Sequence, residues 1–353
     1  MKKHNFSAGP SILPKEVLNQ ASKAVLNFNK KDLSLIEISH RSKDFVEVME
    51  KAQRLVKELL NLPMGYSVLF LQGGASTQFL MSSLNLLKTN GSAAYINTGT
   101  WSEKAIKEAE KFGKVTILGS SKDRNFSYIP KKLNCPKEMN YLHFTSNNTI
   151  FGTQFHDFPK VHSNTLLVCD MSSDIFSRKF DASKFDLIYA GAQKNMGPAG
   201  TTLVIVKNEV LQKTGRDIPS MLDYSIHIKK DSMFNTPPVF PVYVSMLTLE
   251  WLQNNGGIEW IEEINKQKAS ILYNEIDENP LFQGVASKED RSKMNVTFIL
   301  TDKSKEKEFD LAWNHAGING LKGHRSVGGY RASIYNALPL SSVKVLVDVM
   351  HNL

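Results

Sequence analysis

Short apolar runs alternate with amphipathic stretches through the first two-thirds of the chain. The apolar runs are typical of buried strands, and they lie at 67–71, 93–97, 115–118, 141–145 and 165–169. Stretches 76–87 and 102–112 place apolar residues at helical spacing, and Ser102 is expected to cap the second stretch. Short strands separated by helices predict an α/β fold with a mostly parallel sheet.

The pattern changes after residue 185. Two apolar runs, 186–190 and 202–206, are joined by GAQKNMGPAG, which is too short for a helical crossover, so these strands are expected to be antiparallel. Further on, helices are predicted at 242–253, 259–273, 308–315 and 341–351, and strands at 295–300 and 330–335. We therefore expect a large domain at 15–262 and a smaller α+β C-terminal domain at 263–353.

Composition narrows the function classes. The chain has 43 Lys+Arg against 35 Asp+Glu, a formal charge of +8, but its basic residues are scattered and form no block of five or six. A solvated surface is thus favoured over nucleic-acid binding, and a pocket for an anionic small molecule is a third possibility.

No apolar run is long enough to cross a membrane, and no secretory signal is visible. Cys135 and Cys169 form no C-x-x-C pair, which argues against a disulfide scaffold or a cysteine-based zinc module, and a cytoplasmic location is expected.

Two residues after predicted strands could carry chemistry. The sequence lacks G-x-G-x-x-G, the P-loop, G-x-S-x-G and H-E-x-x-H, so dinucleotide binding, P-loop chemistry, the serine-hydrolase elbow and this zinc motif are disfavoured. Asp170 ends one apolar run, and Lys194 lies in the glycine-rich turn after another. A partly desolvated lysine can form a Schiff base with pyridoxal phosphate, whose ring nitrogen needs an acidic partner such as Asp170. The alternatives are a surface lysine and a capping aspartate.

Other candidates would suit a phosphorylated cofactor and anionic substrates. Residues 72–77 (QGGAST) join a strand to a helix and form either a phosphate cradle or an ordinary tight turn. Trp101 could stack on a planar ring or belong to the core. The pairs His40-Arg41 and His324-Arg325, with Arg331, include guanidinium groups that bind carboxylate or phosphate, although each alone is more often a surface residue.

At this point the chain resembles a known family almost end to end. The matching motifs are FSAGPSILP (6–14), EISHRSK (37–43), QGGASTQF (72–79), NTGTWS (97–102), TSNNTIFGTQF (145–155), CDMSSDIFSR (169–178), YAGAQKNMGPAG (189–200), SMFNTPP (232–238) and KGHRSVGGYRASIYNA (322–337). Together they resemble the phosphoserine aminotransferase family of class V, fold-type-I transaminases, which depend on pyridoxal 5'-phosphate. Other class V enzymes share the Asp/Lys pair but not the last two motifs. The resemblance implies the fold-type-I architecture, with the N-terminal segment 1–14 packed on the small domain.

The resemblance implies a role for each candidate residue. Lys194 would form the Schiff base and transfer protons, Asp170 would pair with the ring nitrogen, and Trp101 would stack on the ring. Thr149 would bind near the ring hydroxyl, and Ala75, Ser76 and Gln193 would hold the phosphate. Asn235 and Thr236 would reach that phosphate from the other subunit of a homodimer. Arg331 would bind the substrate α-carboxylate. The distal anion would be bound by His40 and Arg41, with His324 and Arg325 from the partner.

The implied reaction is reversible transfer of an amino group from L-glutamate to 3-phosphohydroxypyruvate, giving O-phospho-L-serine, as in serine biosynthesis. A phosphorylated hydroxythreonine of pyridoxine biosynthesis is a further possible product. One departure is Ser76, where some members carry an arginine that contributes to the distal anion site. The nearest rival, a cysteine desulfurase, needs a reactive cysteine on a mobile loop. Cys169 lies in an apolar run, and Cys135, which could be exposed, has nothing nearby that would depress its pKa.

Overall fold

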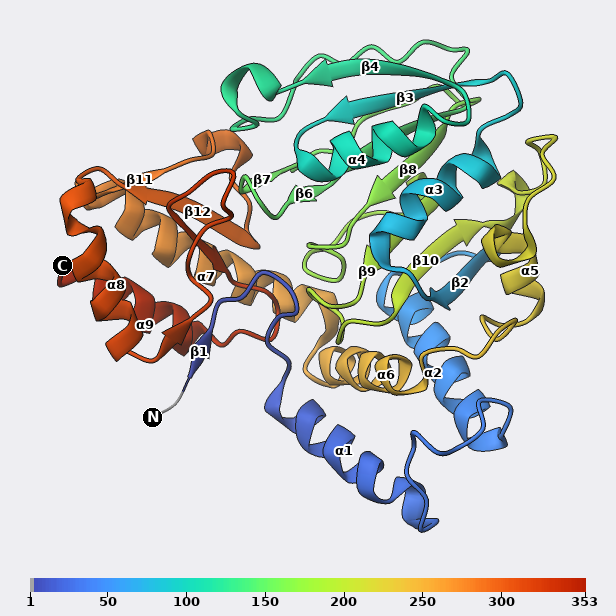
Figure 1. Ribbon diagram of the computed structural model, residues 1–353, viewed down its shortest axis with the longest axis horizontal. Coiled ribbons are helices and arrows are strands. Elements are labelled where there is room, and N and C mark those ends of the chain that lie inside the picture. Colours follow the sequence, from blue (N-terminus) through green and yellow to red (C-terminus); the bar gives the residue numbers. More distant parts are fainter. Residues whose placement is uncertain (1–2) are drawn as a thin grey trace.

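A mixed seven-stranded sheet forms the centre of the computed structural model, which describes residues 3–353 (Figure 1). The strands lie in the order β2 (Tyr66–Leu71), β10 (Thr202–Lys207), β9 (Leu187–Gly191), β8 (Leu166–Asp170), β5 (Tyr141–Thr145), β3 (Ser92–Asn97) and β4 (Lys114–Ser120). Only β10 runs antiparallel to its neighbours β2 and β9, and the other pairs are parallel. The predicted α/β class and the antiparallel pair at 186–206 are therefore confirmed.

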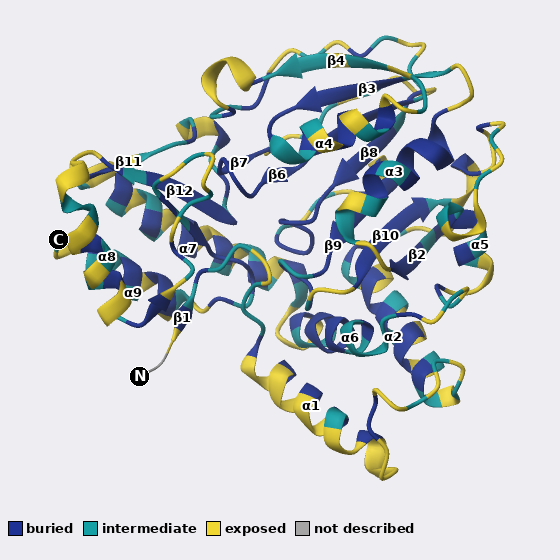
Figure 2. Ribbon diagram, viewed as in Figure 1, coloured by how far each residue is buried: buried dark blue, intermediate teal, exposed yellow. Residues whose placement is uncertain are grey.

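Helices cover both faces of this sheet. On one face lie α3 (Gly74–Leu86), α4 (Thr100–Ala109) and α5 (Tyr224–Lys229), whose buried side chains pack on Tyr95, Tyr141 and Tyr189 of the strands. On the other face lie α2 (Lys43–Leu59) and α6 (Val239–Asn254), packed on Phe70, Phe144 and Ile188. The amphipathic helix α1 (Lys15–Leu26) packs against α6 and leaves much of its surface exposed (Figure 2).

The C-terminal part builds its own hydrophobic cluster. The antiparallel strands β11 (Phe282–Gly284), β12 (Asn295–Leu300) and β14 (Tyr330–Ser333) pack against α7 (Gly257–Glu278), α8 (Glu306–His315) and α9 (Leu340–His351). Strand β1 (His4–Asn5) pairs in parallel with β13 (Ile318–Asn319), and Phe6 is buried in the same cluster. The expected domain boundary at 262/263 falls inside α7, and the division into two domains stays a prediction.

The start of α4 differs from the sequence prediction. Helix α4 begins at Thr100 rather than after Ser102, so Ser102 is not the N-cap residue. Its hydroxyl instead accepts hydrogen bonds from the Thr98 and Gly99 amides, both at 3.0 Å, and so fixes the turn before the helix. Within residues 3–353, no helix combines the length and the apolar character that crossing a membrane requires.

Candidate active site

The carboxyl ends of the parallel strands open into a cavity of about 370 Å³. Such a position is where α/β folds usually bind ligands. Side chains from the large sheet, from α3 and α4, and from the C-terminal part reach it. Of the residues named from the sequence, the cavity is lined by Ala75, Ser76, Trp101, Thr149, Asp170, Gln193, Lys194, His324 and Arg331.

Lys194 enters the cavity from the turn between β9 and β10. Its Nζ donates a hydrogen bond of 2.7 Å to the Thr149 hydroxyl. Desolvation by the surrounding protein lowers the pKa of Lys194 to about 8, and the positive charge of Arg331 acts in the same direction. The carboxylates of Asp170 and Asp174 partly oppose this shift. A useful fraction of the amine is thus unprotonated near neutral pH, as a nucleophile or general base requires.

The N-terminal segment holds the lysine turn from behind. The Ser11 amide donates to the Gln193 carbonyl at 2.9 Å, and the Ser11 hydroxyl donates to the Lys194 carbonyl. A Cβ placed on Gly9 would lie 3.3 Å from Lys194 Cγ, which is tighter than an ordinary contact. A glycine at this position therefore lets the segment approach the lysine stem closely.

Asp170 ends β8 and is almost fully buried at 4% exposure. One carboxylate oxygen accepts hydrogen bonds from the Ser172 amide at 2.9 Å and from the Ser172 hydroxyl at 2.6 Å. Burial raises the pKa of Asp170, while the Lys194 charge and the Ser172 hydrogen bonds oppose the rise. A buried carboxylate of this kind is stabilised by a cationic partner, and a protonated ring nitrogen would supply one.

The N-terminus of α3 forms an anion cradle at one edge of the cavity. Gly73 precedes the helix in the left-handed region at φ 91°, and a Cβ there would collide with the Thr77 hydroxyl. The first amide groups of a helix have no partner within the helix, so those of Ala75 and Ser76 are available to a phosphate. No side chain caps this end of the helix.

Two orphaned donors in the cavity also fit a bound planar, anionic group. Trp101, in the first turn of α4, has its Nε1 buried without a partner, and Lys194 Nζ lies 5.4 Å from the centre of its ring. Arg331, on β14, donates from one terminal nitrogen to the Thr149 carbonyl at 3.4 Å, while its Nε is buried without a partner. The residues present therefore fit pyridoxal 5'-phosphate and a carboxylate substrate.

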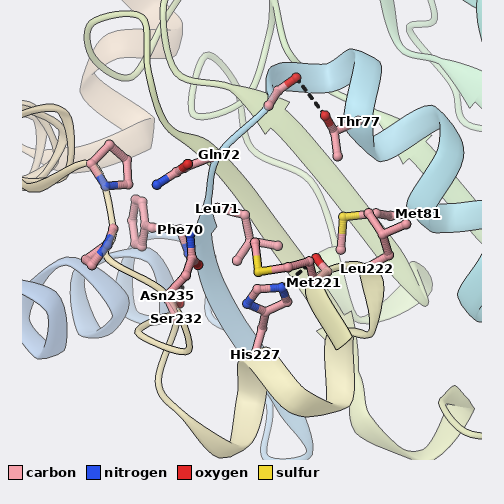
Figure 3. Close-up of a pocket in the computed structure, with 13 residues that line it drawn as sticks. Phe70, Leu71, Gln72, Thr77, Met81, Met221, Leu222, His227, Ser232 and Asn235 are labelled. Atoms are coloured by element: carbon pink, nitrogen blue, oxygen red, sulfur yellow. Dashed lines mark hydrogen bonds between the residues drawn. The ribbon is translucent and has the colours of Figure 1, made fainter. Parts of the chain in front are cut away.

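Five of the predicted residues do not line this cavity. Arg41 and Arg325 are exposed, and His40 lies in the turn before α2. Asn235 lines a separate cavity of about 260 Å³, together with Gln72 and Gly73 at the end of β2 (Figure 3). The neighbouring Thr236 is tied to that turn through its carbonyl, which accepts from Gln72 Nε2 at 2.7 Å. His324, which the resemblance assigns to the partner's site, lines the cavity of its own chain.

Several lining residues were not predicted from the sequence. Four of them are polar: Thr145, Asn147, Ser172 and Ser173. The others are Ala8, Gly9, Gly74 and Ile150. Thr145 ends β5 beside Asp170 in the sheet, and its hydroxyl is buried without a partner. The rule that led to Asp170, that function lies at strand ends, could have found Thr145 as well.

Both cysteines are buried outside this cavity, including Cys135, which the sequence left open as an exposed residue. Burial raises the pKa of each thiol, which disfavours the reactive thiolate that a cysteine desulfurase needs.

Comparison with known proteins agrees with this geometry. A family model described as aminotransferase class-V matches residues 3–346. The phosphoserine aminotransferase of Flavobacterium johnsoniae is 66% identical over 351 residues, covering 99% of this chain and 98% of the relative. A structure of radiation damage to the Schiff base in phosphoserine aminotransferase has a TM-score of 0.95 at 47% identity, covering 100% of this chain and 99% of that one. A pyridoxal-phosphate-bound phosphoserine aminotransferase from Trichomonas vaginalis has a TM-score of 0.93 at 34% identity, covering 99% of this chain and 100% of that one.

The chain therefore belongs to the class-V aminotransferase family, and it is a transaminase with pyridoxal 5'-phosphate as its cofactor. Within that family, its near relatives over the whole length place it among the phosphoserine aminotransferases.

Proposed function

We propose that this chain transfers the amino group of L-glutamate to 3-phosphohydroxypyruvate, giving 2-oxoglutarate and O-phospho-L-serine, in the cytoplasm. One observation in particular supports this proposal: the Lys194 amine and the Arg331 guanidinium both donate to Thr149 inside a single cavity that also holds Asp170. An amine for proton transfer thus stands next to a group suited to a carboxylate. Both amino donors and acceptors of this reaction carry an α-carboxylate and a distal anion, so one site can serve both.

Each residue has a defined part in this proposal. The cofactor, when bound, withdraws electrons from the substrate Cα and so stabilises the carbanion formed there. Lys194 takes the proton from the substrate Cα as a general base, and Asp170 keeps the ring nitrogen protonated. Arg331 binds the α-carboxylate and so fixes which Cα bond faces Lys194. The amides of Ala75 and Ser76, with Gln193, hold the cofactor phosphate, while Trp101 stacks on the ring and Thr149 binds beside it.

The residues outside the cavity belong, in this proposal, to a homodimer with shared sites. Asn235 and Thr236 would reach the cofactor phosphate of the partner, and His40, Arg41 and Arg325 would complete the distal anion site there. The exposure of Arg41 and Arg325 supports this part, because guanidinium groups at a free surface are available to a second chain. His324 stays with its own chain's cavity.

A spectral titration tests the proposed reaction. The purified holoenzyme should show the visible absorption of lysine-bound cofactor, lose it when L-glutamate is added, and regain it when 3-phosphohydroxypyruvate follows. L-Alanine serves as the control donor, since it has an α-carboxylate but no distal anion. Equal rates with L-alanine and L-glutamate, or no recovery with 3-phosphohydroxypyruvate, would contradict the proposed substrates. Restored turnover on mixing Lys194→Ala with Arg325→Ala chains would support shared sites.

A further inference from the structure

Asn295 lies behind the cavity without lining it. It is the first residue of β12, its exposed fraction is 0%, and its side chain makes hydrogen bonds in two directions. The oxygen accepts from Asn147 Nδ2 at 2.8 Å. The amide nitrogen donates to the Ser333 hydroxyl at 3.0 Å and to the Tyr335 hydroxyl at 3.1 Å. Both amide protons are therefore used, and a buried polar group of this kind is costly to leave unpaired.

These hydrogen bonds join the two halves of the site. Asn147 lies in the hairpin of β6 (Asn147–Asn148) and β7 (Thr153–Gln154), two residues before Thr149. Ser333 lies in β14, two residues after Arg331. Facing the cavity, Arg331 donates to the Thr149 carbonyl. The side chain of Asn295 thus forms a second connection behind the Arg331–Thr149 contact, between the same two segments.

The front contact alone would hold Arg331 weakly. Its hydrogen bond to Thr149 is long at 3.4 Å, and its Nε has no partner. The position of Arg331 is instead set by its strand, through the Arg331 amide donating to the Leu321 carbonyl at 2.7 Å and through the pairing of Arg331 with Thr297 on β12. The strands β12 and β14 are in turn anchored to the hairpin by Asn295 and by the Thr297 hydroxyl, which donates to the Phe151 carbonyl at 3.0 Å.

A third tie reaches the N-terminal segment. The Tyr335 hydroxyl, which accepts from Asn295, donates to the Ala8 carbonyl at 2.8 Å. Ala8 and Gly9 line the cavity, and Gly9 lies against the Lys194 stem. Asn295 therefore contacts the Thr149 hairpin and the Arg331 strand directly, and through the Tyr335 hydroxyl it contacts the N-terminal segment that lies against Lys194.

We propose that Asn295 is a positioning residue for the substrate α-carboxylate: it fixes the strand that carries Arg331 against the hairpin that carries Thr149, and through Thr149 against Lys194. The inference rests on the proposed function, because it takes Arg331 to be the group that binds the carboxylate. Removal of the amide lets β14 shift relative to the hairpin, so carboxylate binding weakens. Apart from that of Thr149, the proposed cofactor contacts come from the large sheet and the turn after β9, from α3 and from α4, so the cofactor stays bound.

The test compares Asn295→Ala with a matched buried amide. Asn85 is 2% exposed, and its side chain also makes three hydrogen bonds, to Met81, Leu222 and Tyr224, but none of these partners belongs to β14 or to the β6–β7 hairpin. Asn295→Ala should raise the KM of both L-glutamate and 3-phosphohydroxypyruvate by about tenfold. This is the change expected when carboxylate binding weakens by the typical contribution of one hydrogen bond. Asn85→Ala should lower the melting temperature but leave both KM values unchanged. In both variants the visible absorption of the bound cofactor should match the wild type.

Binding of an unreactive dicarboxylate separates this inference from the proposed substrates. Succinate has no amino or keto group, so its Kd for the holoenzyme, measured by calorimetry, needs no turnover and should rise about tenfold in Asn295→Ala. A wild type that fails to aminate 3-phosphohydroxypyruvate would overturn the proposed function, while the succinate titration would still decide the role of Asn295.

A second variant covers the case in which Asn295→Ala does not fold. Ser333→Ala removes one of the three partners and should raise both KM values in the same direction by a smaller factor, about threefold. Unchanged KM and succinate Kd values in the variant that folds would overturn the proposal. So would a loss of cofactor absorption with KM unchanged, because Asn295 would then serve the Lys194 side of the site.

Discussion

The amine of Lys194 donates a hydrogen bond of 2.7 Å to the hydroxyl of Thr149, a residue 45 positions earlier in the chain. This hydrogen bond restrains the end of the flexible lysine side chain, so the Lys194 nitrogen is held at one position in the cavity. The same residue, through its backbone carbonyl, receives Arg331. Thr149 thus contacts both the group that we propose transfers the proton, Lys194, and the group that we propose binds the carboxylate, Arg331.

Replacing Thr149 by valine removes the hydroxyl and nearly preserves the shape of the side chain. Its carbonyl stays in place for Arg331, so substrate binding should change little, whereas the Lys194 amine loses its anchor. We expect kcat to fall roughly tenfold, with KM within about threefold of the wild type. Steady-state kinetics measure both quantities, and Thr145→Val, in the same cavity but without a hydrogen bond to Lys194, is the control. A larger change in KM than in kcat would contradict this role.

Replacing Lys194 by alanine should abolish covalent attachment of the cofactor. Borohydride reduction followed by mass spectrometry should find the cofactor on the wild-type chain and none on the variant. Turnover should fall to below roughly a thousandth of the wild type, because general acid–base catalysis by a positioned group contributes factors of up to ~10⁴. Activity of the variant near the wild-type level would refute the assignment of Lys194.

The sheet could be predicted closely from the sequence, and so could the presence of Asp170 and Lys194 in one cavity. Strands such as 141–145 were predicted to the residue because a strand buried on both faces reads as a continuous apolar run. Asp170 and Lys194 could be found because they follow such runs. The predicted beginning of α4 was wrong. Ser102 is the third residue of the helix, and its hydroxyl accepts from the Gly99 amide in the turn before it. A serine at the N-cap also accepts a hydrogen bond from a nearby amide, so the sequence does not distinguish the two positions.

What the sequence could not predict are contacts between distant segments. Asn147 and Asn295 are 148 residues apart, and nothing in either neighbourhood indicates that their amides meet. A buried asparagine within a strand reads as a residue on an exposed face, since hydropathy alone cannot tell a satisfied buried amide from a solvated one. The same holds for Thr145, which reads as the end of an apolar run and not as a hydroxyl in a cavity.

Replacing Asp170 by asparagine tests the buried carboxylate separately from the cofactor's attachment. The amide has the same size and can still accept from Ser172, but it carries no negative charge to keep the ring nitrogen protonated. We expect kcat to fall by roughly a hundredfold or more while the cofactor remains bound. Absorption spectra measure the bound cofactor and stopped-flow kinetics the rate with L-glutamate. A variant with nearly full activity would show that the charge of Asp170 is not needed.

Replacing Arg331 by lysine keeps the charge and removes the planar pair of donors. A carboxylate then loses its two-pronged contact, so the KM for L-glutamate and for 3-phosphohydroxypyruvate should both rise by roughly ten- to a hundredfold. The two half-reactions are measured separately by single-turnover kinetics. Because both substrates carry an α-carboxylate, an effect confined to one of them would show that Arg331 binds a different group.

Lys268 is a buried lysine outside the active site that should make stability depend on pH. Its exposed fraction is 0%, and its Nζ donates to the carbonyls of Tyr335 at 2.7 Å and Leu338 at 3.1 Å, with no carboxylate partner among its hydrogen bonds. Burial lowers the pKa of Lys268 to about 7 from its ordinary value of 10.5. Between these two values the unfolded chain holds a proton that the folded chain has released, so the free energy of unfolding rises with pH across this window.

In the holoenzyme, the stability of the wild type relative to Lys268→Met should therefore increase by roughly 2 kcal/mol from pH 7 to pH 9, since one pKa unit corresponds to about 1.4 kcal/mol. Urea denaturation at the two pH values measures this difference. The comparison within each pH cancels the pH dependence of every other group, and Lys15→Met, at an exposed position of α1, should show no such change. A wild-type advantage that is equal at both pH values would mean that Lys268 stays protonated in the folded chain, held by its two carbonyl acceptors.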